Sequence, residues 1–168
     1  MDLKQRKPTR LKSFDYSSSG AYFITICVKD MQNVLSSVVG ADDLGSPSVE
    51  LSKYGKAVEE NLMRMKTIYN DVEIDSYVIM PNHIHLLLKV NGNSFEPNGA
   101  PRSSPPTNTV SKFVSAFKKF SNKDCGMSIW QRGFYDHIIR DDNDYVLHLQ
   151  YISENPKKWL IGKDEYYI

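Results

Sequence analysis

The chain has 168 residues, 40% of them hydrophobic and 24% charged, which is the usual composition of a folded globular domain. Its 21 Lys and Arg residues nearly balance 20 Asp and Glu residues, so the net charge of +1 argues neither for nor against a nucleic-acid partner. Two cysteines without zinc-finger spacing, and no apolar run long enough to span a bilayer, argue against a disulfide-stabilised or membrane protein and predict a cytoplasmic one.

The N-terminal end of the chain is basic. Five of its first twelve residues are Lys or Arg, and only one is acidic. Such a segment is usually just solvated, but its charge also suits contact with phosphate groups. We therefore expect a single domain over residues 1–168 with a basic arm at about 1–12.

Strand and helix patterns mix along the rest of the chain. In chain order they predict strands at 21–29 and 34–39, a turn at 40–48, a helix at 54–69, strands at 72–80 and 83–90, a flexible polar loop at 91–108, a helix at 109–122, two short strands within 129–140 and a helix at 142–155. Pro156 is expected to end the last helix. Because strands and helices do not strictly alternate, we predict an α+β fold of the ferredoxin-like (RRM-like) kind, with a mainly antiparallel sheet and flanking helices.

The strand at 83–90 (HIHLLLKV) carries two histidines. Side chains alternate across a strand, so Ile84, Leu86, Leu88 and Val90 form an apolar row, and His83 and His85 lie together on the opposite face. Their backbones are about 7 Å apart, near enough for both rings to bind one metal ion. On spacing alone, a metal site and a plain surface pair are equally good interpretations, and a metal would need a third ligand.

The helix at 142–155 contains a tyrosine off its main apolar stripe. At 100° per residue, Tyr145, Leu149 and Ile152 predict the stripe that contacts the core, whereas Tyr151 and Asn155 share a different face. Taken alone, these two residues would be interpreted as a surface tyrosine and a helix-ending asparagine.

Four segments, in the same order and spacing, carry a resemblance to a known family: FDYSSSGAYFITICV, VIMPNHIHLLL, WQRGFYDHIIR and YISENP. They resemble the HUH single-tyrosine transposases, and most of all the REP-associated tyrosine transposase branch. HUH stands for His-hydrophobe-His, here His83–Ile84–His85. The resemblance extends over nearly the whole chain, about residues 10–159.

The resemblance implies an activity and a site. Members of this family cut and rejoin single-stranded DNA beside or within a hairpin. Carried over, His83 and His85 hold Mg²⁺ or Mn²⁺, and Tyr151 attacks the scissile phosphate to form a 5′-phosphotyrosine. Asn155 is the expected third ligand and Glu154 the alternative. Imidazole ligands favour Mn²⁺ over Mg²⁺.

Basic residues outside the metal site are expected to contact the DNA backbone. The candidates are Arg10, Lys12, Lys112, Lys118, Lys119, Arg132 and Arg140. The expected partner is single-stranded or hairpin DNA with no membrane partner, and the chain is expected to act as a monomer or homodimer. We expect His137 on a strand beside the site and Trp130 in the core.

Two other functions fit parts of the pattern. A non-catalytic RRM-like module would bind single strands through exposed aromatic residues, but Tyr22 and Phe23 fall on opposite faces of their strand. A zinc hydrolase would use the H-x-H motif, but the further His and Asp set expected downstream is missing. A requirement for a divalent ion in hairpin cleavage would separate the transposase from the binding module, and stoichiometric Zn²⁺ would favour the hydrolase.

Overall fold

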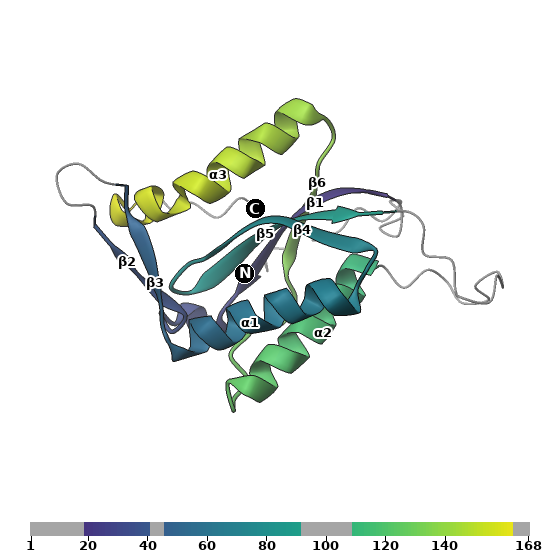
Figure 1. Ribbon diagram of the computed structural model, residues 1–168. Helices are drawn as coiled ribbons and strands as arrows, with labels where there is room; N and C mark the ends of the chain where they lie inside the picture. The colour runs from purple at the N-terminus through teal and green to yellow at the C-terminus, as the bar shows by residue number, and fades with distance from the viewer. Residues whose placement is uncertain (1–18, 41–45, 92–108, 163–168) are drawn as a thin grey trace, which may run out of the picture.

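The computed structural model describes residues 19–40, 46–91 and 109–162 (Figure 1). Its elements are β1 (Gly20–Cys27), the 3-10 turn η1 (Lys29–Met31), β2 (Ser36–Val39), β3 (Ser48–Leu51), α1 (Lys53–Ile68), β4 (Val72–Ile79), β5 (His83–Val90), α2 (Thr109–Asp124), β6 (Tyr135–Ile138) and α3 (Asp142–Leu160). The predicted arm at 1–12 and the loop at 91–108, apart from its first residue, lie outside the described residues.

The main sheet has four strands in the order β4-β5-β1-β6, and each neighbouring pair is antiparallel. The units β1–α1–β4 and β5–α2–β6 interleave, because β5 lies between β1 and β4. This is the split βαβ arrangement of the ferredoxin-like fold, so the predicted fold class is confirmed. β2 pairs instead with β3 in a separate two-stranded sheet, and β3 was not predicted from the sequence.

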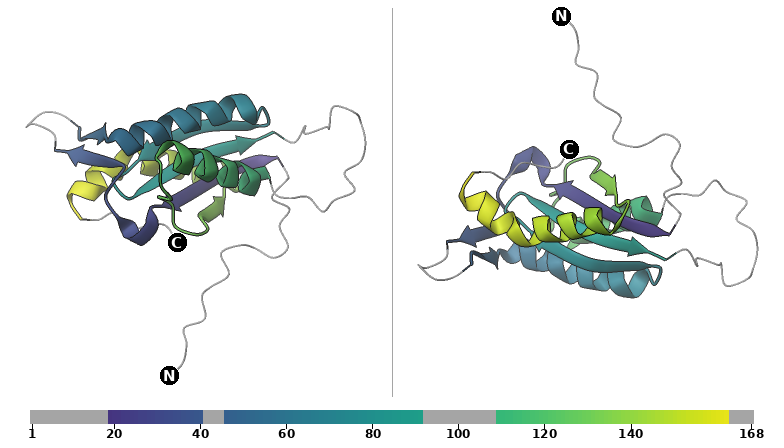
Figure 2. Two further views of the ribbon diagram at one scale, coloured as in Figure 1. Left: turned by 90° about the horizontal axis from the view of Figure 1, so that it is seen from below. Right: turned by 90° about the horizontal axis from the view of Figure 1, so that it is seen from above.

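Helices cover both faces of the main sheet. α1 and α2 lie side by side on one face, and α3 crosses the other (Figures 1 and 2). Alternate strand residues point toward α1 and α2 and pack there with the apolar faces of both helices. This core includes Tyr22, Ile24, Ile26, Ile84, Leu86 and Leu88 of the strands, Val58, Leu62 and Met65 of α1, and Val110, Phe113, Val114 and Phe117 of α2. Among the described residues, no helix has both the length and the apolar character to cross a membrane.

Helix α3 is longer than predicted. It continues through Pro156 to Leu160, although the proline was expected to end it. A proline removes one helical N–H and the hydrogen bond that this group would donate. The next turn still forms, because the N–H of Ile161 donates to the carbonyl of Lys157 at 3.4 Å.

The buried face of α3 also differs from the predicted one. The helix buries His148, Tyr151, Ile152 and Asn155, whereas Leu149 is 40% exposed. The sheet beneath α3 presents histidine and threonine side chains beside a few apolar ones, so the mixed polar face of α3 is the matching partner. An apolar stripe read from the helix alone could not reveal this.

Candidate metal and tyrosine site

β5 begins with the two histidines, and α3 covers them. His83 and His85 are both fully buried, and their ring centroids lie 4.5 Å apart. They point to the face of the sheet opposite Ile84 and Leu86, as the strand pattern predicted. The alternative interpretation, a half-exposed surface pair, is therefore wrong.

In both histidine rings, Nδ1 lies within hydrogen-bond distance of a side-chain oxygen. Nδ1 of His83 lies 2.7 Å from Oδ1 of Asn82, and because that amide oxygen only accepts, Nδ1 must donate. Nδ1 of His85 lies 2.8 Å from the hydroxyl oxygen of Thr25, which can accept in the same way. Metal-binding histidines commonly have such a partner, which fixes the tautomer and leaves Nε2 with its lone pair.

Nε2 of His85 is the atom that most directly indicates a ligand. It is buried and has no hydrogen-bond partner among the described residues. A buried polar atom in this state is costly unless a water or ion satisfies it. The donor set at this position therefore fits a bound metal ion.

Burial keeps both imidazoles neutral. It lowers the pKa of His83 to about 4, although a side-chain hydrogen bond with Asn155 acts in the opposite direction. Burial also lowers the pKa of His85 well below its ordinary value, and the nearby His83 and His148 lower it further. Neutral imidazole is the form that binds a metal, so both rings are ready to do so at pH 7.

α3 places a tyrosine against His85 and an asparagine against His83. The Tyr151 ring centroid lies 5.2 Å from that of His85 and 5.8 Å from that of Phe23. Asn155, one helical turn later, is fully buried and hydrogen-bonded to His83. Tyr151 was expected outside the core contact, but it is only 5% exposed, so that expectation is wrong.

The two candidates for the third ligand lie in different environments. The Glu154 carboxylate accepts from Nε2 of Gln150 at 2.7 Å and lies 3.4 Å from the Lys158 ammonium, with its side chain 42% exposed. Asn155 is the one that faces the histidines. The structure thus favours Asn155, which stays a prediction as a ligand.

Three residues beside the site were not predicted from the sequence. Asn82 and Thr25 hold the histidine rings, and Asn82 also donates to the Met31 carbonyl at 3.4 Å. Lys158 places its ammonium 4.5 Å from the centroid of the Tyr151 ring. The register of β1 against β5 would have revealed Thr25, which pairs with His85, but a single sequence does not give that register.

The described residues among those predicted to bind DNA come from α2, from the segment between α2 and β6, and from the turn before α3. Lys112 and Lys119 are exposed on α2, the helix that lies on the opposite face of the sheet from α3 (Figure 1). Lys118 instead donates to the backbone carbonyls of Gln131, at 2.8 Å, and Gly133, and burial lowers its pKa to about 8.

Lys118 therefore lies beside Arg132, which is flanked by Gln131 and Gly133. Arg132 and Arg140 are exposed, and Arg10 and Lys12 lie outside the described residues. Trp130 is buried and donates to the Ser121 hydroxyl at 2.7 Å, which confirms its predicted place in the core.

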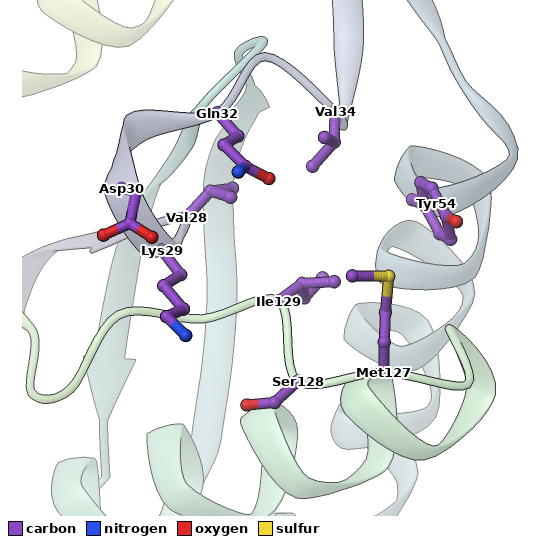
Figure 3. Close-up of a pocket in the computed structure, with 9 residues that line it drawn as sticks. All are labelled: Val28, Lys29, Asp30, Gln32, Val34, Tyr54, Met127, Ser128 and Ile129. Atoms are coloured by element: carbon purple, nitrogen blue, oxygen red, sulfur yellow. The ribbon is translucent and has the colours of Figure 1, made fainter.

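A separate pocket lies beyond the end of β1. Its volume is about 190 Å³, and its walls come from η1 and the segment after it, from α1, and from the segment after α2 (Figure 3). The lining side chains are Val28, Lys29, Asp30, Gln32, Val34, Tyr54, Met127, Ser128 and Ile129. None of them is a candidate metal ligand, nucleophile or DNA-binding residue, so the pocket is not part of this site.

Comparison with known proteins gives the family. No protein-family model matches the chain. An uncharacterized Haemophilus influenzae protein is 30% identical over 179 residues, which cover 99% of this chain and 95% of that protein. A second Haemophilus influenzae protein, whose name places it among the REP-associated tyrosine transposases, is 30% identical over 147 residues, 86% of this chain and 74% of its own length. An Escherichia coli K12 REP-associated tyrosine transposase is 33% identical over 87 residues, 51% of this chain and 45% of its own.

A solved structure matches the fold. It is a REP-associated tyrosine transposase bound to a REP hairpin, with a TM-score of 0.57 and 22% identity, and the match covers 95% of this chain and 74% of that one. The ferredoxin-like sheet with α3 across it is thus a fold found in a tyrosine transposase. The second Haemophilus influenzae relative also shows the family, because it is 30% identical and most of its length is matched. The chain belongs to the REP-associated tyrosine transposases.

Proposed function

We propose that the chain is a metal-dependent endonuclease and strand transferase that cuts single-stranded DNA at hairpins, with Tyr151 as the nucleophile. The observation that carries the proposal is the buried cluster of β5 and α3, in which Tyr151 lies against His85 and the fully buried Asn155 interacts with His83. Membership of the transposase family supports a DNA substrate, and the related structure bound to a hairpin supports its form.

His83, His85 and Asn155 would hold the cation. Two imidazole nitrogens and one amide oxygen suit Mn²⁺ better than Mg²⁺, so we expect Mn²⁺ to support activity at least as well. When bound, a divalent cation neutralises charge on the phosphate oxygens and orients the phosphate for attack. Asn82 and Thr25 contribute by holding the two rings in position through Nδ1.

Tyr151 would carry out the covalent step. Its phenol oxygen forms a bond to phosphorus as the bond between phosphorus and the 3′ oxygen breaks; the phenol loses its proton and the leaving oxygen gains one. A phenol has a pKa of about 10, so it needs help to ionise. The Lys158 ammonium lies beside the ring, where it would supply an opposite charge to the phenolate.

The product would be a 5′-phosphotyrosine and a free 3′-hydroxyl. One ester bond replaces another, so the reverse attack by a 3′-hydroxyl can rejoin strands. Because Tyr151 already lies against His85 of its own chain, a second copy is not needed to complete the site. A monomer and a homodimer are therefore both compatible with the proposal, as is the cytoplasmic location predicted from composition.

A tyrosine-to-phenylalanine pair tests the proposal. The chain is incubated with a panel of hairpin oligonucleotides in Mn²⁺, Mg²⁺ or EDTA, and covalent adducts are separated on denaturing gels. We expect a metal-dependent adduct in the wild type, none with Tyr151→Phe, and a normal yield with Tyr145→Phe. Tyr145 is a matched control because it lies on the same helix and its hydroxyl donates to Asp75 instead.

Mass spectrometry of the trapped adduct then locates the phosphate. Linkage to any residue but Tyr151 would show that the assignment of the nucleophile is wrong. Nicking without an adduct in every hairpin tested would contradict the single-tyrosine mechanism. Binding without any cleavage would favour a non-catalytic single-strand-binding module.

A further inference from the structure

The four histidines of the chain form two separate pairs. His83 and His85 make the first, and His137 and His148 make the second, with ring centroids 4.6 Å apart and nearly parallel planes. Phe23 lies between the pairs, with its ring 5.0 Å from that of His85 and 4.7 Å from that of His148. The second pair has no part in the proposed strand transfer.

A carboxylate joins the second pair. The Asp144 carboxylate lies 2.9 Å from Nε2 of His137 and 3.1 Å from Nδ1 of His148. One ligand atom from each of the three side chains lies within 4.8 Å of the other two. Among the described residues, this is the only set of three His, Cys, Asp or Glu side chains that meets this criterion.

These distances match a metal coordination shell. With metal–nitrogen and metal–oxygen bonds of about 2.0–2.1 Å, neighbouring ligand atoms are about 2.9–3.4 Å apart. The two carboxylate–imidazole distances already fall in that range, and a small movement of His137, whose side chain is 42% exposed, closes the third. Two hydrogen bonds must be exchanged, because Nε2 of His137 donates to the Asp144 carboxylate and Nδ1 of His148 lies 2.8 Å from the Asp144 carbonyl; metal binding moves each ring proton to the other ring nitrogen.

The fold gives the three ligands a firm arrangement. Asp144 and His148 are four residues apart on α3, so they lie on one face of the helix. His137 comes from β6, where it pairs with Phe23 of β1 and so faces α3. The Asp144 carboxylate also accepts from the Arg140 backbone N–H at 3.0 Å, and this bond, together with His137 and His148, lowers its pKa. The carboxylate is thus held ionised at the junction of β6 and α3.

We propose that His137, Asp144 and His148 bind a second divalent ion of the imidazole-preferring class, such as Zn²⁺ or Co²⁺. Two histidines and one carboxylate leave positions for water, and Mg²⁺ is a poor match for this donor set. The ion links β6 to α3 one turn before Tyr151, so it stabilises the docked position of the helix that carries the nucleophile. The inference does not depend on the proposed cleavage reaction.

Titration with Co²⁺ tests the second site, because its visible absorption reports the ligands directly. The wild-type chain should bind two equivalents, and the His83→Ala/His85→Ala double variant should keep one. The His137→Ala variant should also keep one, and the variant lacking all four histidines should bind none with similar affinity. Absorption without the strong thiolate band shows that Cys27 and Cys125 are not the ligands.

Thermal unfolding with Zn²⁺ gives a second readout. Zn²⁺ should raise the midpoint of the His83→Ala/His85→Ala variant and have no such effect once His137→Ala is added; Mg²⁺ should raise neither. If the double variant does not fold, the test compares the wild type with His137→Ala. A fall from two bound Co²⁺ equivalents in the wild type to one in His137→Ala supports the site. A single equivalent in both chains, or none in a folded His83→Ala/His85→Ala variant, overturns it. A wild-type chain that binds two ions but forms no DNA adduct would instead contradict the proposed function and leave the second metal site intact.

Discussion

The two faces of the main sheet are both buried, but they bury different chemistry. Toward α1 and α2 the strands present an almost continuous apolar surface, including Ile24, Ile84 and Leu86. Toward α3 they present His83, His85 and Thr25 beside Phe23 and Leu87, which form a small apolar cluster with Tyr151 and Ile152 of α3. Low exposure therefore does not by itself identify a core: one face buries an apolar surface, whereas the other also buries the polar groups of the candidate site.

Removal of either histidine should have the largest effect. We expect His83→Ala and His85→Ala each to abolish adduct formation, because each removes one of only two imidazoles that would hold the cation. Gel assays with a cleavable hairpin in Mn²⁺ check this, with circular dichroism to confirm folding. Thr25→Ser is the matched control on this face: it keeps the oxygen beside Nδ1 of His85, so activity should persist. A normal adduct yield from either alanine variant would show that the substituted histidine is not needed for catalysis.

Leucine truncation on the two faces should separate their roles in stability. Leu86 belongs to the large core under α1 and α2, and Leu87 to the small cluster under α3, although both are fully buried. Leu→Ala changes in protein cores cost about 2–5 kcal/mol, and less where the surroundings can close the cavity. We expect Leu86→Ala near the upper end and Leu87→Ala near the lower, measured by urea unfolding. Equal losses would show that α3 is packed as rigidly as α1 and α2.

Acid should weaken the metal-free fold through the α3 face. The pKa of His83 is about 4 in the folded chain and about 6.5 in the unfolded chain. Between these two pH values, His83 is protonated only in the unfolded chain. Stability is therefore full above about pH 6.5 and falls as the pH drops toward 4, by about 3 kcal/mol from His83. His85 shifts in the same direction and steepens the loss.

Urea unfolding in EDTA between pH 4 and 8 measures this dependence. The His83→Gln variant removes one titrating group, so its stability should fall less steeply between pH 6.5 and 4. Identical slopes in the two chains would mean that His83 is not buried as a neutral ring in solution.

The surface lysines should give the smallest effect and test a difference within α2. The logarithm of the DNA-binding constant falls linearly with the logarithm of the salt concentration. Each lysine that binds one phosphate of single-stranded DNA steepens this slope by about 0.7, and its removal makes the slope shallower by that amount. We expect this change for Lys112→Gln and Lys119→Gln, which are exposed. Lys118→Gln should leave the slope unchanged and lower stability instead, because its ammonium holds the carbonyls of Gln131 and Gly133. A lower slope for Lys118→Gln alone would reverse this assignment.

The sequence was sufficient for features set by local periodicity. The alternation in β5 predicted which residues face α1 and α2, and it placed His83 and His85 together on the other face. The helices at 54–69 and 109–122 were predicted, and both pack their apolar stripes on an apolar surface, which is the case that such a stripe describes.

The failures concern α3 and depend on tertiary context. The stripe of Tyr145, Leu149 and Ile152 was the most apolar one, but the sheet offered a partly polar partner, so His148, Tyr151 and Asn155 are buried instead. The short strand β3 alternates weakly and depends on its pairing with β2. The roles of Asn82 and Thr25 follow from contacts across the fold, which no spacing in the sequence shows.

The cover that α3 forms over the site also affects how the chain would bind its substrate. Because His83, His85 and Asn155 are fully buried and Tyr151 is nearly so, we expect α3 to shift before a phosphate can reach them. Apparent affinity then equals intrinsic affinity multiplied by the fraction of molecules with α3 displaced; an open fraction of about 1% weakens binding about a hundredfold. Any substitution that loosens α3 without touching the ligands would tighten DNA binding, and selectivity for a hairpin would rest partly on whether its contacts offset the cost of opening.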